Sequence, residues 1–173
     1  RSLPFGPHGQ HVTVRLVDFN DLAANHYVAS TQVTFRAGPA ERRADILLYV
    51  NGFPLVLVEA KTPVRAAVSW VDGALQVHDD YERYVPELFA ANVFSLATEG
   101  KDLRYGSIHM PVELWGPWRP ATTPDGATDA HGLVDLRAAA RNLLAPATVL
   151  DLLEHFTLFA TDSQQRRIKL VCR

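Results

Sequence analysis

Hydrophobic and polar positions alternate over the first part of the chain. Residues 11–19 and residues 27–35 each alternate apolar with polar side chains and are rich in β-branched types. Polar residues, glycine or proline bound both segments. A period of two is typical of a strand with one buried face. The pattern therefore predicts two strands before residue 36.

The most apolar part of the chain is residues 44–61, where two nearly continuous apolar runs flank Asn51-Gly52. Asn-Gly between two such runs is the strongest short-range signal of a β-hairpin. Strands this apolar are usually covered on both faces of a sheet. We therefore expect a buried hairpin here.

After Pro63 the hydrophobic period changes from two to that of a helix. The residues that recur at helical spacing are Val68, Val71, Leu75, His78 and Tyr81. They predict a helix over about 66–83, and Pro86 opens a short second helix over 87–91. Residues 92–97 and 103–109, which are separated by a polar turn, predict two more strands.

The last third of the chain contains a segment of loop composition, then two helical patterns and a pair of short strands. Residues 116–131 are rich in Pro, Gly, Thr and Asp, which is typical of a loop or linker. Residues 133–143 and 149–156 have helical period, and residues 157–159 and 168–171 can form a terminal strand pair. The expected division is a core at 1–115, a loop or linker at 116–131 and a helical segment at 132–173. The fold class expected is α/β, with a mixed central β-sheet flanked by helices.

Length and composition are those of one globular domain. The chain has 173 residues, of which 47% are hydrophobic and 21% charged. No apolar run approaches the roughly 18 to 20 residues of a membrane-spanning helix. The first residues do not resemble a signal peptide, and the single Cys172 cannot form an internal disulfide, so we expect a cytoplasmic location.

The net charge of the chain indicates how well it can bind DNA by itself. The net charge is −2 and the pI is about 6.4. Autonomous DNA-binding domains usually have a basic patch and a high pI, so these values argue against tight, unaided binding to DNA. They do not exclude a nuclease, because another domain can provide the phosphate contacts.

The residues best suited to chemistry are Asp45 and, after thirteen residues, Glu59-Ala60-Lys61. Two carboxylates at strand ends can hold a divalent cation such as Mg²⁺. A nearby ammonium can orient or deprotonate the attacking water and stabilise charge that builds on a phosphate. These residues therefore suit phosphodiester hydrolysis. From spacing alone, the favoured alternative is a charged triplet that is merely solvated at a strand end.

Strand geometry sets a condition on this site. Glu59 and Lys61 are two apart on a strand, so both side chains project from one face. With a plain two-residue turn at Asn51-Gly52, Asp45 would pair with Val58 and point to the opposite face. The site therefore requires either a three-residue loop with a Gly bulge at this turn or another bulge in the hairpin.

Several motifs together carry a resemblance to a known family. The clearest are Arg43-Ala44-Asp45-Ile46, Val50-Asn51-Gly52-Phe53-Pro54-Leu55, Glu59-Ala60-Lys61 and Ala97-Thr98-Glu99-Gly100. With them, the stretch 14–107 resembles the N-terminal endonuclease domain of the type I restriction enzyme R subunit, a member of the PD-(D/E)xK nuclease superfamily. Residues 152–159 and 168–173 are similar to the stretch that leads into that family's motor.

This resemblance implies a restriction-endonuclease-like core that hydrolyses double-stranded DNA with Mg²⁺, for which Mn²⁺ can substitute. Asp45 and Glu59 would be metal ligands, the Ala60 carbonyl a third, and Lys61 would position the attacking water. It also implies a subunit that translocates DNA using ATP and assembles with modification and specificity subunits. Because the chain has no Gly-x-x-x-x-Gly-Lys-Ser/Thr loop, we expect no ATP bound to it in that manner.

The sequence departs from the family pattern in two places. Ala44 stands where the family has the proline before the catalytic Asp. The family's supporting Gln lies four residues before its Tyr, whereas Gln76 lies five before Tyr81. Either the helix register is adjusted, or Gln76 acts from a neighbouring position. The alternative for this pair is a polar surface residue and an ordinary core aromatic.

Other interpretations stay open at this stage. Arg43 is a candidate phosphate contact, with a solvated charge as the alternative. The domain as a whole would, on a second hypothesis, be a non-catalytic assembly or docking module with vestigial acidic residues. A third hypothesis is another PD-(D/E)xK nuclease, acting on single-stranded or damaged DNA.

Overall fold

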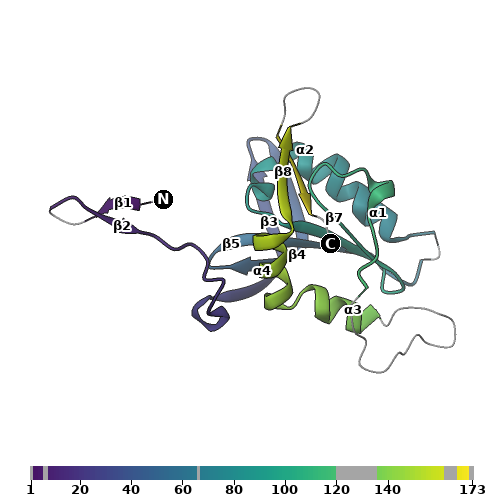
Figure 1. The fold of residues 1–173 in the computed structure, drawn as a ribbon. Coiled ribbons are helices and arrows are strands. Elements are labelled where there is room, and N and C mark those ends of the chain that lie inside the picture. Colours follow the sequence, from purple (N-terminus) through teal and green to yellow (C-terminus); the bar gives the residue numbers. More distant parts are fainter. Residues whose placement is uncertain (1, 6–7, 66, 120–135, 162–166, 172–173) are drawn as a thin grey trace.

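A five-stranded sheet forms the centre of the molecule (Figure 1). The computed structural model describes residues 2–5, 8–65, 67–119, 136–161 and 167–171. In spatial order the strands are β3 (Tyr27–Ala37), β4 (Ala40–Val50), β5 (Phe53–Ala60), β6 (Phe94–Thr98) and β7 (Leu103–Gly106). The pair β5–β6 is parallel and the other pairs are antiparallel. The expectation of a mixed central sheet in an α/β fold is confirmed.

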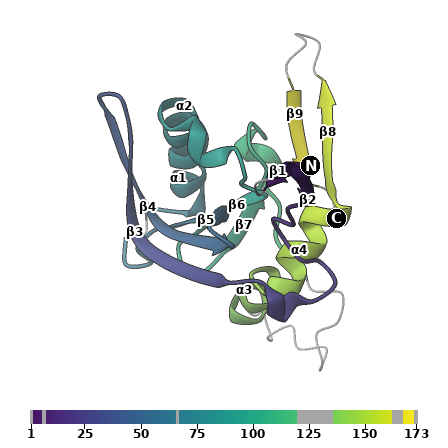
Figure 2. The same ribbon diagram turned by 90° about the vertical axis from the view of Figure 1, so that its left-hand side faces the viewer.

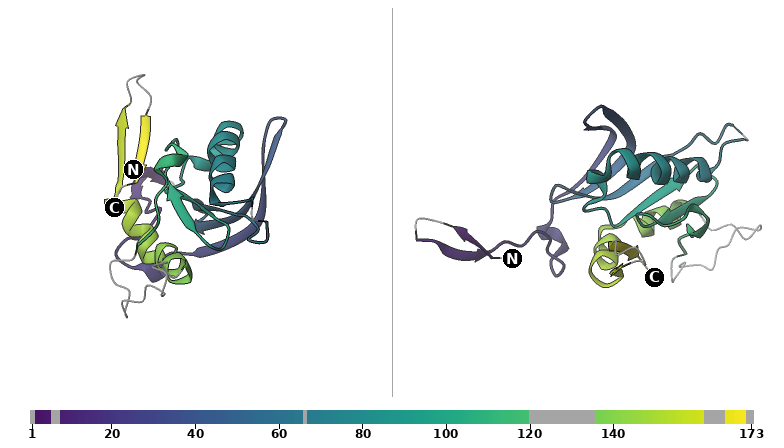
Figure 3. Two further views of the ribbon diagram at one scale, coloured as in Figure 1. Left: turned by 90° about the vertical axis from the view of Figure 1, so that its right-hand side faces the viewer. Right: turned by 90° about the horizontal axis from the view of Figure 1, so that it is seen from above.

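Helices cover both faces of this sheet (Figures 2 and 3). On one face lies a continuous helical stretch made of α1 (Trp70–Leu75), a π-helix (Gln76–Tyr81) and α2 (Glu82–Tyr84). On the other face lie α3 (Leu136–Leu143) and α4 (Pro146–His155). Short 3₁₀ turns occur at Leu22–Ala24, Pro86–Phe89 and Val112–Leu114.

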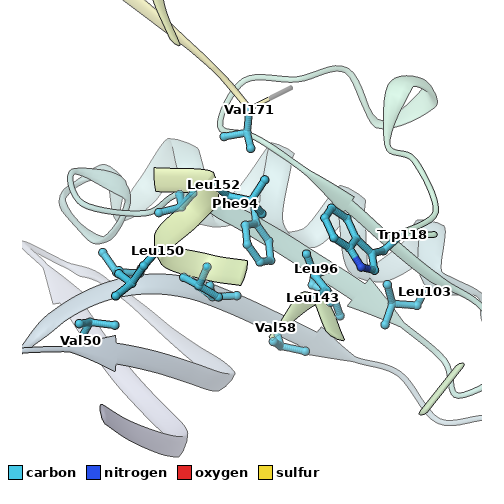
Figure 4. Close-up of a cluster of buried hydrophobic side chains, with 14 of the residues drawn as sticks. Val50, Val58, Phe94, Leu96, Leu103, Trp118, Leu143, Leu150, Leu152 and Val171 are labelled. Atoms are coloured by element: carbon cyan, nitrogen blue, oxygen red, sulfur yellow. The ribbon is translucent and has the colours of Figure 1, made fainter. Parts of the chain in front are cut away.

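The two layers give two hydrophobic cores. One core joins α3 and α4 to the sheet through Leu143, Leu150, Leu152, Val58 and Phe94 (Figure 4). The other joins the helical stretch to the opposite face, and among its members are Leu47, Leu57, Ala74, Val77 and Tyr81. The hairpin β4–β5 is therefore covered on both faces, as its apolar sequence predicts.

Two strand pairs lie outside the central sheet. β1 (Ser2–Phe5) pairs with β2 (Gln10–Thr13), and this hairpin extends away from the sheet (Figure 1). The strand predicted over 11–19 is wrong beyond Thr13, because the carboxylate of Asp18 accepts the backbone N–H groups of Asn20 and Asp21 and forms a turn. The predicted terminal pair is confirmed as β8 (Thr157–Thr161) and β9 (Arg167–Val171).

The long helix differs from its prediction in its start and in its buried face. It begins at Trp70 rather than near 66, because Ser69 caps its first turn. Val71 and Leu75 are 37% and 42% exposed, whereas Tyr81 is 1% exposed, so only part of the predicted apolar stripe is buried. The helix meets the sheet through Gly73 and Ala74 instead. A Cβ on Gly73 would lie 3.3 Å from the Cβ of Ala97, which shows how closely the helix approaches.

The division into a core, a linker and a C-terminal segment stays a prediction. Most of the predicted loop at 116–131 lies outside the described residues, which resume at 136. Within the described part of the chain, no helix is both long enough and apolar enough to cross a membrane.

Candidate active site

The β4–β5 hairpin contains the bulge that the site requires. Asn51 and Gly52 both have positive φ, at 50° and 86°, so the turn itself is a plain two-residue turn. The register then shifts: Tyr49 pairs with Pro54, whereas Leu48 pairs with Val56. The extra residue, Leu55, therefore lies in β5. Of the two alternatives that strand parity allows, the second, a bulge elsewhere in the hairpin, is confirmed.

This bulge brings the two acidic residues to one face of the sheet. Beyond the shift, Ile46 pairs with Val58. Continued by one residue, the same register places Asp45 opposite Glu59. Without the extra residue Leu55, Asp45 would lie opposite Val58 and point toward the other core.

Asp45 is held at both of its carboxylate oxygens. Its Oδ2 accepts a hydrogen bond of 2.9 Å from the backbone N–H of Ala60, at the end of β5. Its Oδ1 accepts one of 2.9 Å from Nε2 of Gln32, on β3. Donors on the two neighbouring strands therefore restrict the rotation of this half-buried carboxylate.

Glu59 and Lys61 form an ion pair in which Glu59 is buried and Lys61 is partly exposed. The side chain of Glu59 is 3% exposed, and Nζ of Lys61 donates to its Oε1 at 2.8 Å. Burial raises the pKa of Glu59; the pairing with Lys61 opposes this rise and the charge of Asp45 adds to it. Asp45 is thus close enough to Glu59 for its charge to affect the pKa of Glu59.

The π-helix explains the unusual spacing of Gln76 and Tyr81. In this helix the N–H of Glu82 donates to the carbonyl of Val77, five residues earlier, so residues five apart lie on one face. Nε2 of Gln76 donates to the hydroxyl of Tyr81 at 2.6 Å, and Nζ of Lys61 donates to Oε1 of Gln76. The first alternative, an adjusted helix register, is confirmed, and Gln76 links Lys61 to Tyr81.

Tyr81 ties the π-helix to the sheet. It is 1% exposed, and its hydroxyl donates to the carbonyl of Arg43 at 2.8 Å and lies 3.3 Å from Oε2 of Glu59. Burial and the charge of Glu59 raise the pKa of Tyr81, so the hydroxyl keeps its proton and remains a donor. The side chain of Arg43 is exposed at this edge of β4.

The oxygen atoms of this cluster suit a hard divalent cation. Each oxygen of a carboxylate has two lone pairs, so a hydrogen bond to Asp45 or Glu59 leaves room for a metal bond. Within the described residues, no group of three or more His, Cys, Asp or Glu is placed to hold a metal. Mg²⁺ is commonly held by one or two carboxylates and keeps several waters, so two carboxylates fit Mg²⁺ better than Zn²⁺ or Ca²⁺.

Two residues near the site were not singled out as site residues from the sequence. Gly73 lets α1 approach the sheet closely, since a Cβ there would lie 3.3 Å from the Cβ of Ala97, next to Glu59 in the sheet. Gln32 lies across from Asp45, and the position of the turn at Gly38-Pro39 could have predicted this arrangement from the sequence. With Ala37 opposite Ala40, counting back along the two strands brings Gln32 opposite Asp45.

Comparison with known proteins adds the family. The family described as type I restriction enzyme R protein N terminus matches residues 6–111, more than half of the chain. The chain belongs to this family. Within the matched range lie all five residues of the cluster: Asp45, Glu59, Lys61, Gln76 and Tyr81.

Curated relatives of this type I R-protein domain bear similar names. It shares 31% identity over 162 residues with the type I restriction enzyme HindI endonuclease subunit of Haemophilus influenzae, covering 91% of this chain and 15% of that subunit. It shares 28% over 110 residues with the putative MjaVIIP endonuclease subunit of Methanocaldococcus jannaschii, covering 58% of this chain and 10% of that subunit. The chain thus spans only a small part of these relatives, all of which are named as endonuclease subunits.

Proposed function

We propose that this chain is the Mg²⁺-dependent nuclease module of a type I restriction enzyme and that it hydrolyses phosphodiester bonds of double-stranded DNA. The observation that carries the proposal is the convergence of Asp45, Glu59 and Lys61 on one face of the sheet, beneath the π-helix. The proposed fold is correspondingly a restriction-endonuclease-like core. The remainder of such an enzyme would supply the ATP-driven motor and the modification and specificity subunits.

Asp45 and Glu59, with the carbonyl of Ala60, would hold the cation, Mg²⁺ or Mn²⁺. When bound, the cation supplies a Lewis acid that stabilises charge on the scissile phosphate and makes bound water more acidic. Asp45 is already oriented for this role by its two hydrogen bonds.

Lys61 would act on the attacking water. Two of its three N–H groups point at Glu59 and Gln76, which leaves one to donate to a water or to a phosphate oxygen. Gln76 accepts a hydrogen bond from this ammonium and donates one to the hydroxyl of Tyr81. Gln76 and Tyr81 therefore act as positioning residues. The ammonium of Lys61 can also stabilise the negative charge that develops on the phosphate.

The deciding experiment replaces Lys61 with Ala in the complete restriction enzyme that contains this chain. We expect cleavage of double-stranded DNA to fall by at least about 100-fold, the usual scale for loss of a group that stabilises a transition state, while ATP-driven translocation continues. Gel assays of linear product and a translocation assay measure the two activities separately.

A matched control is Lys101→Ala, which removes an exposed lysine from the turn between β6 and β7 and should leave both activities unchanged. Normal double-strand cleavage by Lys61→Ala would contradict the proposal. It would favour a docking module, the class to which the net charge of −2 is also suited.

A further inference from the structure

Gln32 has a backbone conformation that its position in a strand does not explain. Its φ is +54°, in the left-handed region that residues with a side chain rarely adopt. Among the described residues, the other non-glycine positions with positive φ are Asn51 and His109, and both lie in turns. Gln32 instead lies in the middle of the eleven-residue strand β3.

The surrounding ladder does not require this conformation. Thr31 pairs with Ile46 and Val33 pairs with Ala44, so the register is the same on both sides of Gln32 and no residue is inserted. The pair between Gln32 and Asp45 is missing from the ladder. Gln32 is also exposed, so burial of its side chain does not explain the conformation either.

The contact of the Gln32 side chain with Asp45 supplies a reason. Its Nε2 donates to Oδ1 of Asp45 at 2.9 Å, while the N–H of Ala60 holds the other oxygen. Donors from β3 and β5 thus grip the same carboxylate from its two sides, since β4 lies between those strands. Groups that hydrogen-bond to a metal-binding carboxylate fix its orientation and commonly change metal affinity by roughly 10- to 100-fold.

We propose that Gln32 is a positioning residue, whose left-handed backbone aims its carboxamide at Asp45 and holds that carboxylate ready for a divalent cation. The inference rests on the proposed function, because it assigns Asp45 a metal to bind. It goes beyond that function by naming an uncommon backbone conformation on β3 as part of the site.

The test is Gln32→Gly in the 173-residue chain, with Mn²⁺ as the probe in calorimetric titrations and thermal unfolding without metal. Glycine adopts positive φ without steric cost, so we expect a melting temperature equal to or above that of the wild type. Because the donor to Asp45 is lost, we expect Mn²⁺ affinity to fall roughly 10-fold or more. Gln32→Asn, which also tolerates this conformation but is one methylene shorter, should show the same loss of affinity.

Thr34→Gly is the matched control, because Thr34 lies two residues further along β3 and pairs with Arg43 rather than Asp45. Glycine in a regular strand weakens it, so this variant should melt at a lower temperature and bind Mn²⁺ like the wild type. Gln32→Gly should therefore lower the Mn²⁺ affinity without lowering the melting temperature, and Thr34→Gly should lower the melting temperature without lowering the affinity.

Three results would overturn the inference. If Gln32→Gly binds Mn²⁺ like the wild type while Asp45→Ala does not, Gln32 has no positioning role and the proposed function stands. If Gln32→Gly loses stability and affinity together, the role of Gln32 is structural. If the wild type itself binds no Mn²⁺, the proposed function fails and this inference fails with it.

Discussion

Glu82 is a second buried carboxylate near the π-helix, and its environment differs from that of Glu59. It is 6% exposed, and its Oε2 accepts the backbone N–H of His109 at 2.9 Å and lies 3.0 Å from that residue's ring Nδ1. Burial raises the pKa of Glu82, and the contacts with His109 and the charge of His78 only partly oppose this rise. Among the described residues, no lysine or arginine forms an ion pair with Glu82, although the charge of Lys169 interacts with it from β9.

Glu82 should therefore make stability depend on pH. Since its pKa is higher in the folded chain than the ordinary 4.5, its contribution to stability is fully present below pH 4.5 and is lost as the pH rises through the raised value. We expect the free energy of unfolding of the wild type, relative to Glu82→Gln, to fall as the pH rises above 4.5. The loss is about 1.4 kcal/mol for each unit by which folding raises the pKa.

Urea unfolding of both proteins across this range measures the difference, in which the titration of distant groups cancels. Glu113→Gln, at an exposed carboxylate on the 3₁₀ turn Val112–Leu114, should show no such trend. A difference between the wild type and Glu82→Gln that stays constant or grows with pH would contradict the assignment.

At the scale of elements, the π-helix acts as a one-residue insertion. It holds Gln76 and Tyr81 on one face although they are five residues apart, while the flanking α1 and α2 continue with ordinary geometry. The inserted residue is accommodated on the solvent side, where Asp79 is exposed. Removing that residue should let the π-helix close into an α-helix.

We expect deletion of Asp79 to preserve both the fold and the site. Gln76 would then lie four residues before Tyr81, a spacing that also shares a helix face. The melting temperature should change by no more than roughly 4 °C, which corresponds to about 1 kcal/mol in a domain of this size. Thermal unfolding and Mn²⁺ titration measure the two effects.

Deletion of Asp151 is the comparison, because it removes a residue from the middle of the regular helix α4. Buried Leu150 and Leu152 lie on either side of it, and one half of the helix would rotate out of the core. This variant should unfold at a much lower temperature. An equal loss in both deletions would show that the π-helix is not an insertion of this kind.

The same elements show what the sequence can and cannot predict. Asn51-Gly52 identifies the hairpin and strand parity demands a bulge, but no residue type marks Leu55 as its place. Helical periodicity locates the long helix but wrongly assigns Val71 and Leu75 to its buried face. The helix packs on the sheet through small residues such as Gly73, and this packing depends on partners distant in sequence, which periodicity does not show. The positive φ of Gln32 leaves no trace in composition or period, so only the structure reveals it.

At the scale of the whole molecule, the pairing of arginines with carboxylates limits how tightly this chain can bind DNA alone. The arginines of the central sheet that form ion pairs with carboxylates are Arg36 with Glu41, Arg42 with Asp80, and Arg104 with Asp102. The net charge is −2. Affinity for duplex DNA comes mainly from cations that replace counterions along the phosphates, and paired arginines replace few of them.

We therefore expect the isolated chain to bind duplex DNA no more tightly than a non-specific binder, with a Kd of roughly 10⁻⁴ to 10⁻⁶ M at physiological salt. Fluorescence anisotropy across a salt series measures this, and a slope of log K against log salt near −2 would correspond to about two neutralised phosphates. Asp80→Asn, which frees Arg42 from its carboxylate, should strengthen binding, whereas Asp21→Asn, at an exposed carboxylate that forms no ion pair of its own among the described residues, should change it less. Nanomolar binding by the isolated chain would mean that it finds DNA by itself. If the proposed function holds, weak binding would mean that other parts of a larger subunit, or its partners, must bring the phosphate to Asp45 and Lys61.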